Sequence, residues 1–200
     1  MRQIKSAFGF LWALWGACWF MIVVIPFTII YALVFLFTGK KYVRECIWVN
    51  CHYLCNFLLK IYFIRFTEFG KEKIDPKRTY VFVANHLTQI DILLTGASVP
   101  HPVSFLAKAE IKHIPFFGYM TKMLAIMVDR KNKESRDKSI RYMIAELNKG
   151  YSIFIYPEGT RNRTAMPLKE FKDGAFKLAI MSQVPIVAQT FVGVKEVNNP

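Results

Sequence analysis

Residues 7–37 form a run of 31 residues without a single charged side chain. Wound as one α-helix, this run would be about 46 Å long, whereas the hydrocarbon core of a bilayer is roughly 30 Å thick. The run is too long for the apolar part of a cleaved signal peptide, and no small-residue cleavage site ends it. We therefore expect the N-terminal part of the chain to be helical and embedded in a membrane.

Two arrangements of this run fit its length: a single tilted span, or two short arms that bend near Pro26 and stay in one leaflet. Basic residues flank the run on both sides: Arg2, Lys5, Lys40, Lys41 and Arg44. A single span would carry one of these clusters across the membrane, whereas the positive-inside rule favours both on the cytoplasmic side. The charges therefore favour the bent, monotopic arrangement, on the cytoplasmic face of the inner (plasma) membrane.

Residues 42–66 continue with a second helical pattern, which is less apolar than the first. Its aromatic residues suit a membrane–water interface: Trp48, Tyr53, Tyr62 and Phe63. A turn signal follows at residues 73–78, so we expect a membrane-associating region at 1–66 and a globular region at 67–200. Because the chain stops at Pro200, soon after its last expected strand and with no closing helix, we expect the globular region to be truncated at its C-terminus.

From residue 79 onward, short apolar runs alternate with helical patterns. The apolar runs are rich in β-branched and aromatic residues and are expected as strands: residues 79–84, 103–107, 124–128, 151–156 and 184–191. Helices are expected at residues 90–97, 108–112, 118–123, 135–148 and 176–181. The first strand has no polar alternation, as in a strand that is buried on both faces. The order of these elements predicts an α/β fold with a mostly parallel central sheet flanked by helices.

The chain has 27 basic and 14 acidic residues, which gives a net charge of +13. Such a charge favours an anionic partner: nucleic acid, an anionic membrane surface or a phosphorylated substrate. The aromatic residues gather in the apolar helices instead of alternating with Lys and Arg on a sheet face, and no nucleic-acid-binding motif is present. We therefore expect an anionic membrane surface and a phosphorylated substrate as partners, and no nucleic acid.

All four cysteines lie in the first, apolar third of the chain: Cys18, Cys46, Cys51 and Cys55. No C-x-x-C spacing occurs, so neither a disulfide framework nor a zinc site is expected. Cys51, His52 and Cys55 could in principle share a metal ion, but small polarisable side chains that fill a membrane-facing helix are the simpler interpretation. We expect no metal at these residues.

Residues 85–91, Asn-His-Leu-Thr-Gln-Ile-Asp, directly follow the first expected strand. His86 and Asp91 are five residues apart, so they would lie on different faces of one helix or one strand. They can meet only if the chain turns between them and Asp91 lies in the first turn of a helix, where the helix dipole favours a carboxylate. There the carboxylate can hold the imidazole in one tautomer and stabilise its protonated form.

A His–Asp pair of this kind is either a general base or a structural contact, in which a buried histidine bonds to a helix-capping aspartate. Catalytic Ser or Cys nucleophiles usually lie on a glycine-flanked turn such as G-x-S-x-G, and this sequence has no such motif. If the pair is catalytic, we expect His86 to deprotonate a hydroxyl of the substrate and not one of the protein.

Three more expected strands end in charged residues. Lys108 follows the second strand, Arg130 follows the third, and the turn 156–161 with Arg161 follows the fourth. Because the carboxyl ends of parallel strands meet at one edge of a sheet, we expect these residues to lie on the same edge as His86. The planar fork of an arginine pairs bidentately with phosphate oxygens, so this edge is predicted to bind an anionic ligand.

Four segments, in this order, resemble the motifs of the glycerolipid acyltransferase family, whose central member is 1-acylglycerol-3-phosphate (lysophosphatidic acid) acyltransferase. Asn85, His86 and Asp91 match the N-H-x4-D motif of that family, and residues 126–130 match its apolar strand that ends in an arginine. Residues 156–162 match F-P-E-G-T-R-S with Tyr156 for Phe and Asn162 for Ser. Residues 184–188 match V-P-I-V-P with Ala188 for the last Pro. The segment 171–176 also looks familial, and the resemblance covers about residues 67–191.

This resemblance implies transfer of a fatty acyl group from acyl-CoA or acyl-carrier protein to the free hydroxyl of a lysophospholipid. His86, steadied by Asp91, would be the base, without a metal or a cofactor. The implied substrate-binding residues are Lys108, Arg130, Glu158, Gly159, Thr160 and Arg161. Because three of these side chains are basic, the favoured acceptor is 1-acylglycerol-3-phosphate, and the product is then phosphatidic acid.

Several alternatives remain open. For Glu158, a structural ion pair with a nearby arginine is the alternative to a place in the acceptor pocket. For the whole chain, the alternatives are acyl transfer to another lysolipid and hydrolysis of a lipid by a His–Asp pair that activates water. A membrane scaffold without catalytic activity would leave the aligned residues at the strand ends unexplained.

Overall fold

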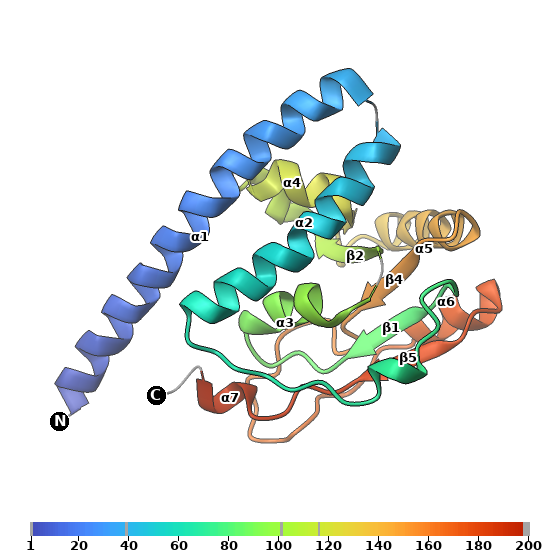
Figure 1. Cartoon of the computed structure of the whole chain (residues 1–200). Coiled ribbons are helices and arrows are strands. Elements are labelled where there is room, and N and C mark those ends of the chain that lie inside the picture. The colour runs from blue at the N-terminus through green and yellow to red at the C-terminus, as the bar shows by residue number, and fades with distance from the viewer. Residues whose placement is uncertain (1, 39, 101, 116, 198–200) are drawn as a thin grey trace.

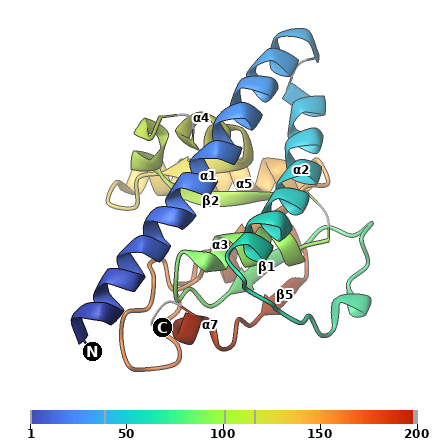
Figure 2. The ribbon, with the colours of Figure 1, turned by 60° about the vertical axis from the view of Figure 1, so that its left-hand side comes forward.

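The structure is a computed structural model that describes residues 2–38, 40–100, 102–115 and 117–197. A hairpin of two long helices, α1 (Arg2–Thr38) and α2 (Lys40–Ile61), leans against an α/β body (Figures 1 and 2). Among the described residues, α1 is the one helix long and apolar enough to cross a membrane by length and composition. Its segment Gly9–Val34 has a mean hydropathy of 2.4, and most of its side chains are left uncovered by the rest of the chain.

The predicted bend at Pro26 is wrong, because α1 runs through this residue without a break (Figure 1). The chain reverses instead between Thr38 and Lys40, where α1 ends and α2 begins. Proline removes only one N–H bond from the helix. Thr28 adds a local bond in the same turn, because its hydroxyl donates to the Val24 carbonyl (2.7 Å). Bonds of this kind allow apolar helices to accommodate a proline.

The α/β body is built on a five-stranded sheet in the order β3-β2-β4-β1-β5. The strands are β1 (Val81–Ala84), β2 (Val103–Lys108), β3 (Ala125–Val128), β4 (Ser152–Ile155) and β5 (Ile186–Gln189). Every neighbouring pair is parallel, so the predicted α/β fold is confirmed. All residues of β1 and β4 are buried, which explains why these strands show no polar alternation.

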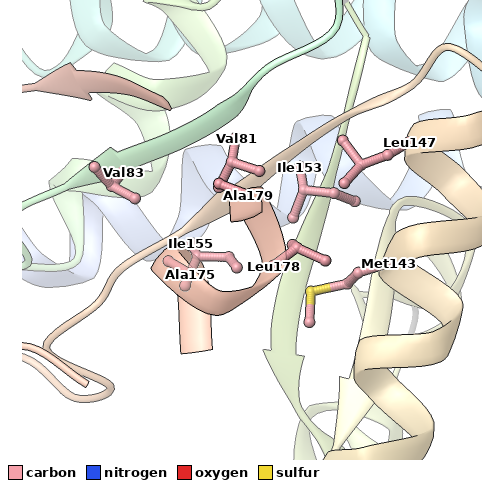
Figure 3. Packing of buried hydrophobic residues seen from close by; sticks show 9 residues of the cluster. All are labelled: Val81, Val83, Met143, Leu147, Ile153, Ile155, Ala175, Leu178 and Ala179. Atoms are coloured by element: carbon pink, nitrogen blue, oxygen red, sulfur yellow. The ribbon is translucent and has the colours of Figure 1, made fainter. Parts of the chain in front are cut away.

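Helices cover both faces of the sheet. On one face, α5 (Lys133–Asn148) and α6 (Gly174–Ser182) pack against β1 and β4 through one apolar cluster (Figure 3): Val81, Val83, Met143, Leu147, Ile153, Ile155, Ala175, Leu178 and Ala179. On the other face, Trp48 of α2 packs with Phe82 and Phe154. The remaining α-helices are α3 (Ile90–Ser98), α4 (Phe117–Leu124) and α7 (Val194–Val197), and two short 3-10 helices lie at Lys71–Lys73 and Ala109–His113.

Most element boundaries lie within two residues of those that the sequence predicts, and two differences are larger. The second N-terminal helix ends at Ile61 and not near residue 66, because Phe63 adopts a left-handed backbone with φ of 56°. A single helical turn, α7, follows β5, where no helix was expected. The predicted division of the chain near residue 66 stays a prediction.

Helix α2 is tied to α3 by a close contact at Gly96. A Cβ atom on Gly96 would lie 2.5 Å from the Cys55 sulfur and 3.3 Å from the Cys55 Cβ. One turn earlier on α2, His52 Nδ1 donates to the Gly96 carbonyl (3.2 Å). The side chains that might have shared a metal, His52 and Cys55, are therefore packed against α3. Because α3 also carries Asp91, this contact fixes the N-terminal hairpin relative to the site.

We expect Gly96→Ala to destabilise the protein. A glycine-to-alanine change inside a helix normally stabilises by about 0.5–1 kcal/mol, but overpacking typically costs about 1–3 kcal/mol. The midpoint of thermal unfolding of the purified chain in detergent should therefore fall. Adding Cys55→Ala, which removes the obstructing sulfur, should restore part of the loss. The matched control is Gly174→Ala, since no atom lies within 4 Å of a Cβ there; an equal fall in this control would contradict the steric explanation.

Candidate active site

His86 and Asp91 meet at the carboxyl end of β1. The chain turns after β1, and Asp91 lies in the first turn of α3. The distance from His86 Nδ1 to Asp91 Oδ2 is 2.8 Å. The Asp91 side chain is fully buried, whereas that of His86 is 17% exposed. The residues that the sequence pairs are thus in contact, in the geometry that their spacing requires.

The Asp91 carboxylate accepts four hydrogen bonds. Its Oδ2 accepts from the imidazole and from the backbone N–H groups of Leu87 (2.6 Å) and Thr88 (2.8 Å). Its Oδ1 accepts from the Thr88 hydroxyl (3.1 Å). Since a carboxylate can only accept, the His86 proton lies on Nδ1 when the ring is neutral. The other ring nitrogen, Nε2, is then left with a free lone pair, which can take a proton.

The backbone of His86 is held on both sides by the turn that follows β4. The His86 N–H donates to Glu158 Oε1 (2.8 Å), and the His86 carbonyl accepts from the Asn162 N–H (2.6 Å). The preceding residue is fixed as well, because the Asn85 side chain exchanges two hydrogen bonds with the backbone of Phe191 (2.9 and 2.7 Å). Three chain segments therefore converge on the histidine.

The Glu158 carboxylate accepts hydrogen bonds from backbone N–H groups of the protein. Its side chain is buried, and its second oxygen, Oε2, accepts from the Lys169 N–H (3.3 Å). The ion pair with an arginine considered for this residue is absent from the described part of the structure, where backbone N–H groups occupy both carboxylate oxygens. In this geometry Glu158 holds the His86 backbone in place, and a role of Glu158 in the acceptor pocket stays a prediction.

Tyr156 stacks on His86, a contact that the sequence does not predict. The ring centroids are 4.1 Å apart and the planes differ by 18°. The Tyr156 hydroxyl bonds to Thr95 Oγ1 of α3 (2.8 Å). Burial raises the pKa of Tyr156, so the hydroxyl stays protonated. The one signal in the sequence is the tyrosine in a motif position that usually holds phenylalanine.

The turn after β4 also carries the three predicted substrate-binding residues that follow Glu158. Gly159 has a φ of +73°, which favours glycine. The Thr160 hydroxyl accepts from Lys169 Nζ (2.9 Å). Arg161 directly precedes Asn162, whose N–H bonds to the His86 carbonyl. Among the described residues, the Arg161 guanidinium forms no hydrogen bond or ion pair, so it is available for an anionic ligand beside His86.

The two other predicted basic residues lie farther along the same edge. Lys108 ends β2 and forms an exposed ion pair with Glu110 (2.9 Å). Arg130 follows β3; partial burial lowers its pKa, while the nearby Glu110 acts in the opposite direction. Neighbouring strands are about 4.8 Å apart, so β2 and β3 lie roughly 10 and 14 Å from β1. Arg161 therefore lies closest to the histidine, whereas Lys108 and Arg130 form a separate group with Glu110.

Comparison with known proteins identifies the family of this chain. A family model described as Acyltransferase matches residues 65–192, which include the whole site. The chain belongs to the acyltransferase family. This confirms the resemblance seen in the motifs. Within the described residues of this acyltransferase-family chain, no three His, Cys, Asp or Glu side chains gather as metal ligands would.

Two curated relatives share this family's region of the chain. The 1-acyl-sn-glycerol-3-phosphate acyltransferase of Saccharomyces cerevisiae is 28% identical over 152 residues, which cover 74% of this chain and 49% of that protein. The enzyme of the same name from Salmonella typhimurium is 33% identical over 109 residues, which cover 54% of this chain and 44% of that protein. The chain thus spans about half the length of the curated relatives it matches.

One solved acyltransferase structure has the same fold. It is the crystal structure of the 1-acyl-sn-glycerophosphate (LPA) acyltransferase PlsC from Thermotoga maritima, which superposes with a TM-score of 0.77 at 22% identity. The match covers 91% of this chain and 73% of that chain. The N-terminal helices are therefore part of the shared architecture, together with the sheet.

Proposed function

We propose that this chain is a membrane-bound O-acyltransferase that moves a fatty acyl group from acyl-CoA or acyl-carrier protein to a lysophospholipid. The favoured acceptor is 1-acylglycerol-3-phosphate, and the product is then phosphatidic acid. The observation that carries the proposal is the His86–Asp91 pair, whose Nε2 is free to take a proton at the carboxyl edge of the sheet. The activity named for the relatives supports the same reaction.

In this mechanism His86 Nε2 removes the proton from the acceptor's free hydroxyl as its oxygen attacks the thioester carbonyl. The C–O bond forms, the C–S bond breaks, and the departing thiolate takes the proton back from the imidazolium. Asp91 stabilises the imidazolium while it exists, because its carboxylate is fixed by Leu87 and Thr88. No acyl-enzyme forms.

The acceptor's phosphate is the ligand that the basic residues of this edge would hold. Arg161 is the first candidate, because it lies next to His86 and is otherwise unpaired among the described residues. Arg130 and Lys108 extend the positive charge along the edge, although Glu110 already neutralises part of it. A phosphate bound at Arg161 would place the acceptor's hydroxyl within reach of His86, which favours a phosphate-bearing acceptor over a neutral one.

A panel of lysolipid acceptors tests the proposal, with acyl-CoA and acyl-carrier protein compared as donors and the products identified by mass. Diacyl product from 1-acylglycerol-3-phosphate, with little free fatty acid, is expected. A larger yield of diacyl product from a lysolipid with a neutral or zwitterionic head group would show that this lysolipid, and not 1-acylglycerol-3-phosphate, is the preferred acceptor. Release of free fatty acid in place of diacyl product would show a hydrolase and overturn the proposal.

We expect Arg161→Ala to raise the KM for the acceptor about tenfold to a hundredfold, because a charge-assisted contact contributes roughly 1.5–3 kcal/mol. Arg130→Ala should act in the same direction and more weakly, since Arg130 follows a more distant strand. The KM for the donor should stay unchanged in both variants. Arg78, an exposed arginine beside the amino end of β5, provides the matched control as Arg78→Ala. A rise in the donor's KM instead would assign these arginines to the donor's phosphates.

The proposed location is the cytoplasmic face of the inner (plasma) membrane, with α1 and α2 in a single leaflet. It rests on the apolar, uncovered surface of α1 and on the basic residues that flank it in the sequence. Cysteines introduced at positions 3 and 39, after the native cysteines are replaced, should be shielded from an impermeant thiol reagent in intact cells. A cysteine at Gln183, on the α/β body, is the control and should react only after permeabilisation. Labelling of position 3 or 39 from outside would show a true span.

A further inference from the structure

The segment 163–172, which follows the turn after β4, is exposed along its whole length. It nevertheless carries three large apolar side chains: Met166 is 64% exposed, Leu168 is 49% exposed and Phe171 is 41% exposed. Single exposed apolar residues are ordinary, but three within six residues of one loop indicate a surface that contacts something apolar. We call residues 163–172 the β4–α6 loop.

Basic residues are interleaved with these apolar side chains. Three of the four charged residues of the loop are basic: Arg163, Lys169 and Lys172, with Glu170 as the exception. Lys195 of α7 adds a fourth positive charge, because its Nζ donates to the carbonyls of Thr164 (3.0 Å) and Met166 (3.4 Å). Apolar side chains surrounded by Lys and Arg are suited to the interface of an anionic bilayer, where each basic residue near the surface contributes attraction.

The position of the β4–α6 loop is also consistent with contact with a bilayer. Both views place the loop (orange), α7 and the beginning of α1 at the same end of the molecule, opposite the turn between α1 and α2 (Figures 1 and 2). Other apolar side chains are exposed in the first half of α1 and just after α2, among them Phe10, Leu11 and Phe63. Phe63 contacts Trp12 of α1, with 6.1 Å between the ring centroids. The loop thus shares its end of the molecule with the helix whose apolar surface is uncovered.

We propose that the β4–α6 loop is a second membrane contact, separate from the N-terminal helices, and that it docks on the headgroup region of an anionic lipid bilayer. The loop is bonded directly to the two residues that hold the His86 backbone. Asn162 Nδ2 donates to the Met166 carbonyl (2.9 Å), and the Lys169 N–H donates to Glu158 (3.3 Å). A bilayer-docked loop therefore sets the height of the histidine relative to the lipid headgroups.

Fluorescence quenching tests the contact in the full chain. After the four native cysteines are replaced by alanine, a single cysteine at position 168 carries an environment-sensitive fluorophore. The protein is reconstituted in vesicles of phosphatidylcholine and phosphatidylglycerol, with or without bromine on the lipid chains. The matched control is a cysteine at Ile180, which is 69% exposed on α6 near the amino end of β5. We expect brominated lipid to quench the label at 168 and to leave the label at 180 unchanged.

Two further measurements fix the nature of the partner. Quenching at 168 should weaken in vesicles without phosphatidylglycerol and in the Arg163→Glu variant, because both remove attraction between loop and lipid. Equal fluorescence at 168 with and without bromine would overturn the proposal. So would a label at 168 that responds to an acidic protein such as acyl-carrier protein and not to lipid, because the loop would then be a protein-docking surface. None of these readouts depends on acyl transfer, so they stand apart from the proposed function.

Discussion

Replacing His86 by alanine should lower acyl transfer by about 10²–10⁴-fold, the usual contribution of a general base. The variant should still fold, because Leu87 and Thr88 continue to donate to the Asp91 carboxylate when the imidazole is gone. The measurement is the turnover number at saturating acceptor and donor, together with the midpoint of thermal unfolding and the fraction of protein bound to vesicles.

The matched control for this experiment is His113→Ala. His113 is exposed at the end of the 3-10 helix Ala109–His113, away from any contact with Asp91. Its loss should leave turnover unchanged. Turnover close to the unmodified value in His86→Ala, with an intact fold, would remove His86 as the base and leave the pair with a purely structural role.

Asp91→Asn should lower turnover by a smaller factor, about tenfold to a hundredfold, which corresponds to roughly 1.5–3 kcal/mol for a charge-assisted hydrogen bond. The backbone N–H groups of Leu87 and Thr88 need an acceptor, so the amide oxygen should take the place of Oδ2, and the amide nitrogen can donate to the Thr88 hydroxyl. The imidazole then keeps its tautomer and loses only the charge that stabilises its protonated form.

The comparison with Asp91→Ala separates this chemical effect from a structural one. Alanine leaves the backbone N–H groups of Leu87 (part-buried) and Thr88 (buried) without an acceptor, at up to about 1–3 kcal/mol each. The midpoint of thermal unfolding should therefore fall in Asp91→Ala and stay unchanged in Asp91→Asn. Unchanged turnover in Asp91→Asn would mean that the carboxylate acts only as a helix cap.

The sheet could be predicted from the sequence because its central strands are covered on both faces. Uninterrupted β-branched and aromatic runs between helical patterns correspond to β1 and β4, and their burial accounts for the lack of polar alternation. The bend at Pro26 was predicted wrongly because local propensity was given too much weight. One missing hydrogen bond does not end a long apolar helix whose neighbouring turns stay bonded.

Individual contacts of the site could be predicted only where its residues are close in sequence. His86 and Asp91 are five residues apart in the sequence, and this short separation allows them to meet only across a turn into a helix. Their contact therefore follows from local geometry. The roles of Glu158 and Tyr156 depend on strand β4 lying beside β1, more than 70 residues away in the chain. The spatial order β3-β2-β4-β1-β5 differs from the chain order. The separation of Lys108 and Arg130 from His86 therefore could not be read from the sequence.

The two hydrogen bonds between Asn85 and Phe191 join residues 106 positions apart, and this separation has a consequence during synthesis. At about 5–20 residues per second, the ribosome needs roughly 5–20 s to make the chain between them. Throughout that interval the apolar N-terminal helices are already made, while Asn85 lacks its two bonds to Phe191. Glu158 and Asn162, which hold the His86 backbone, are made only in the later part of the same interval. The nascent chain can therefore reach a membrane before the proposed base, His86, is held in place.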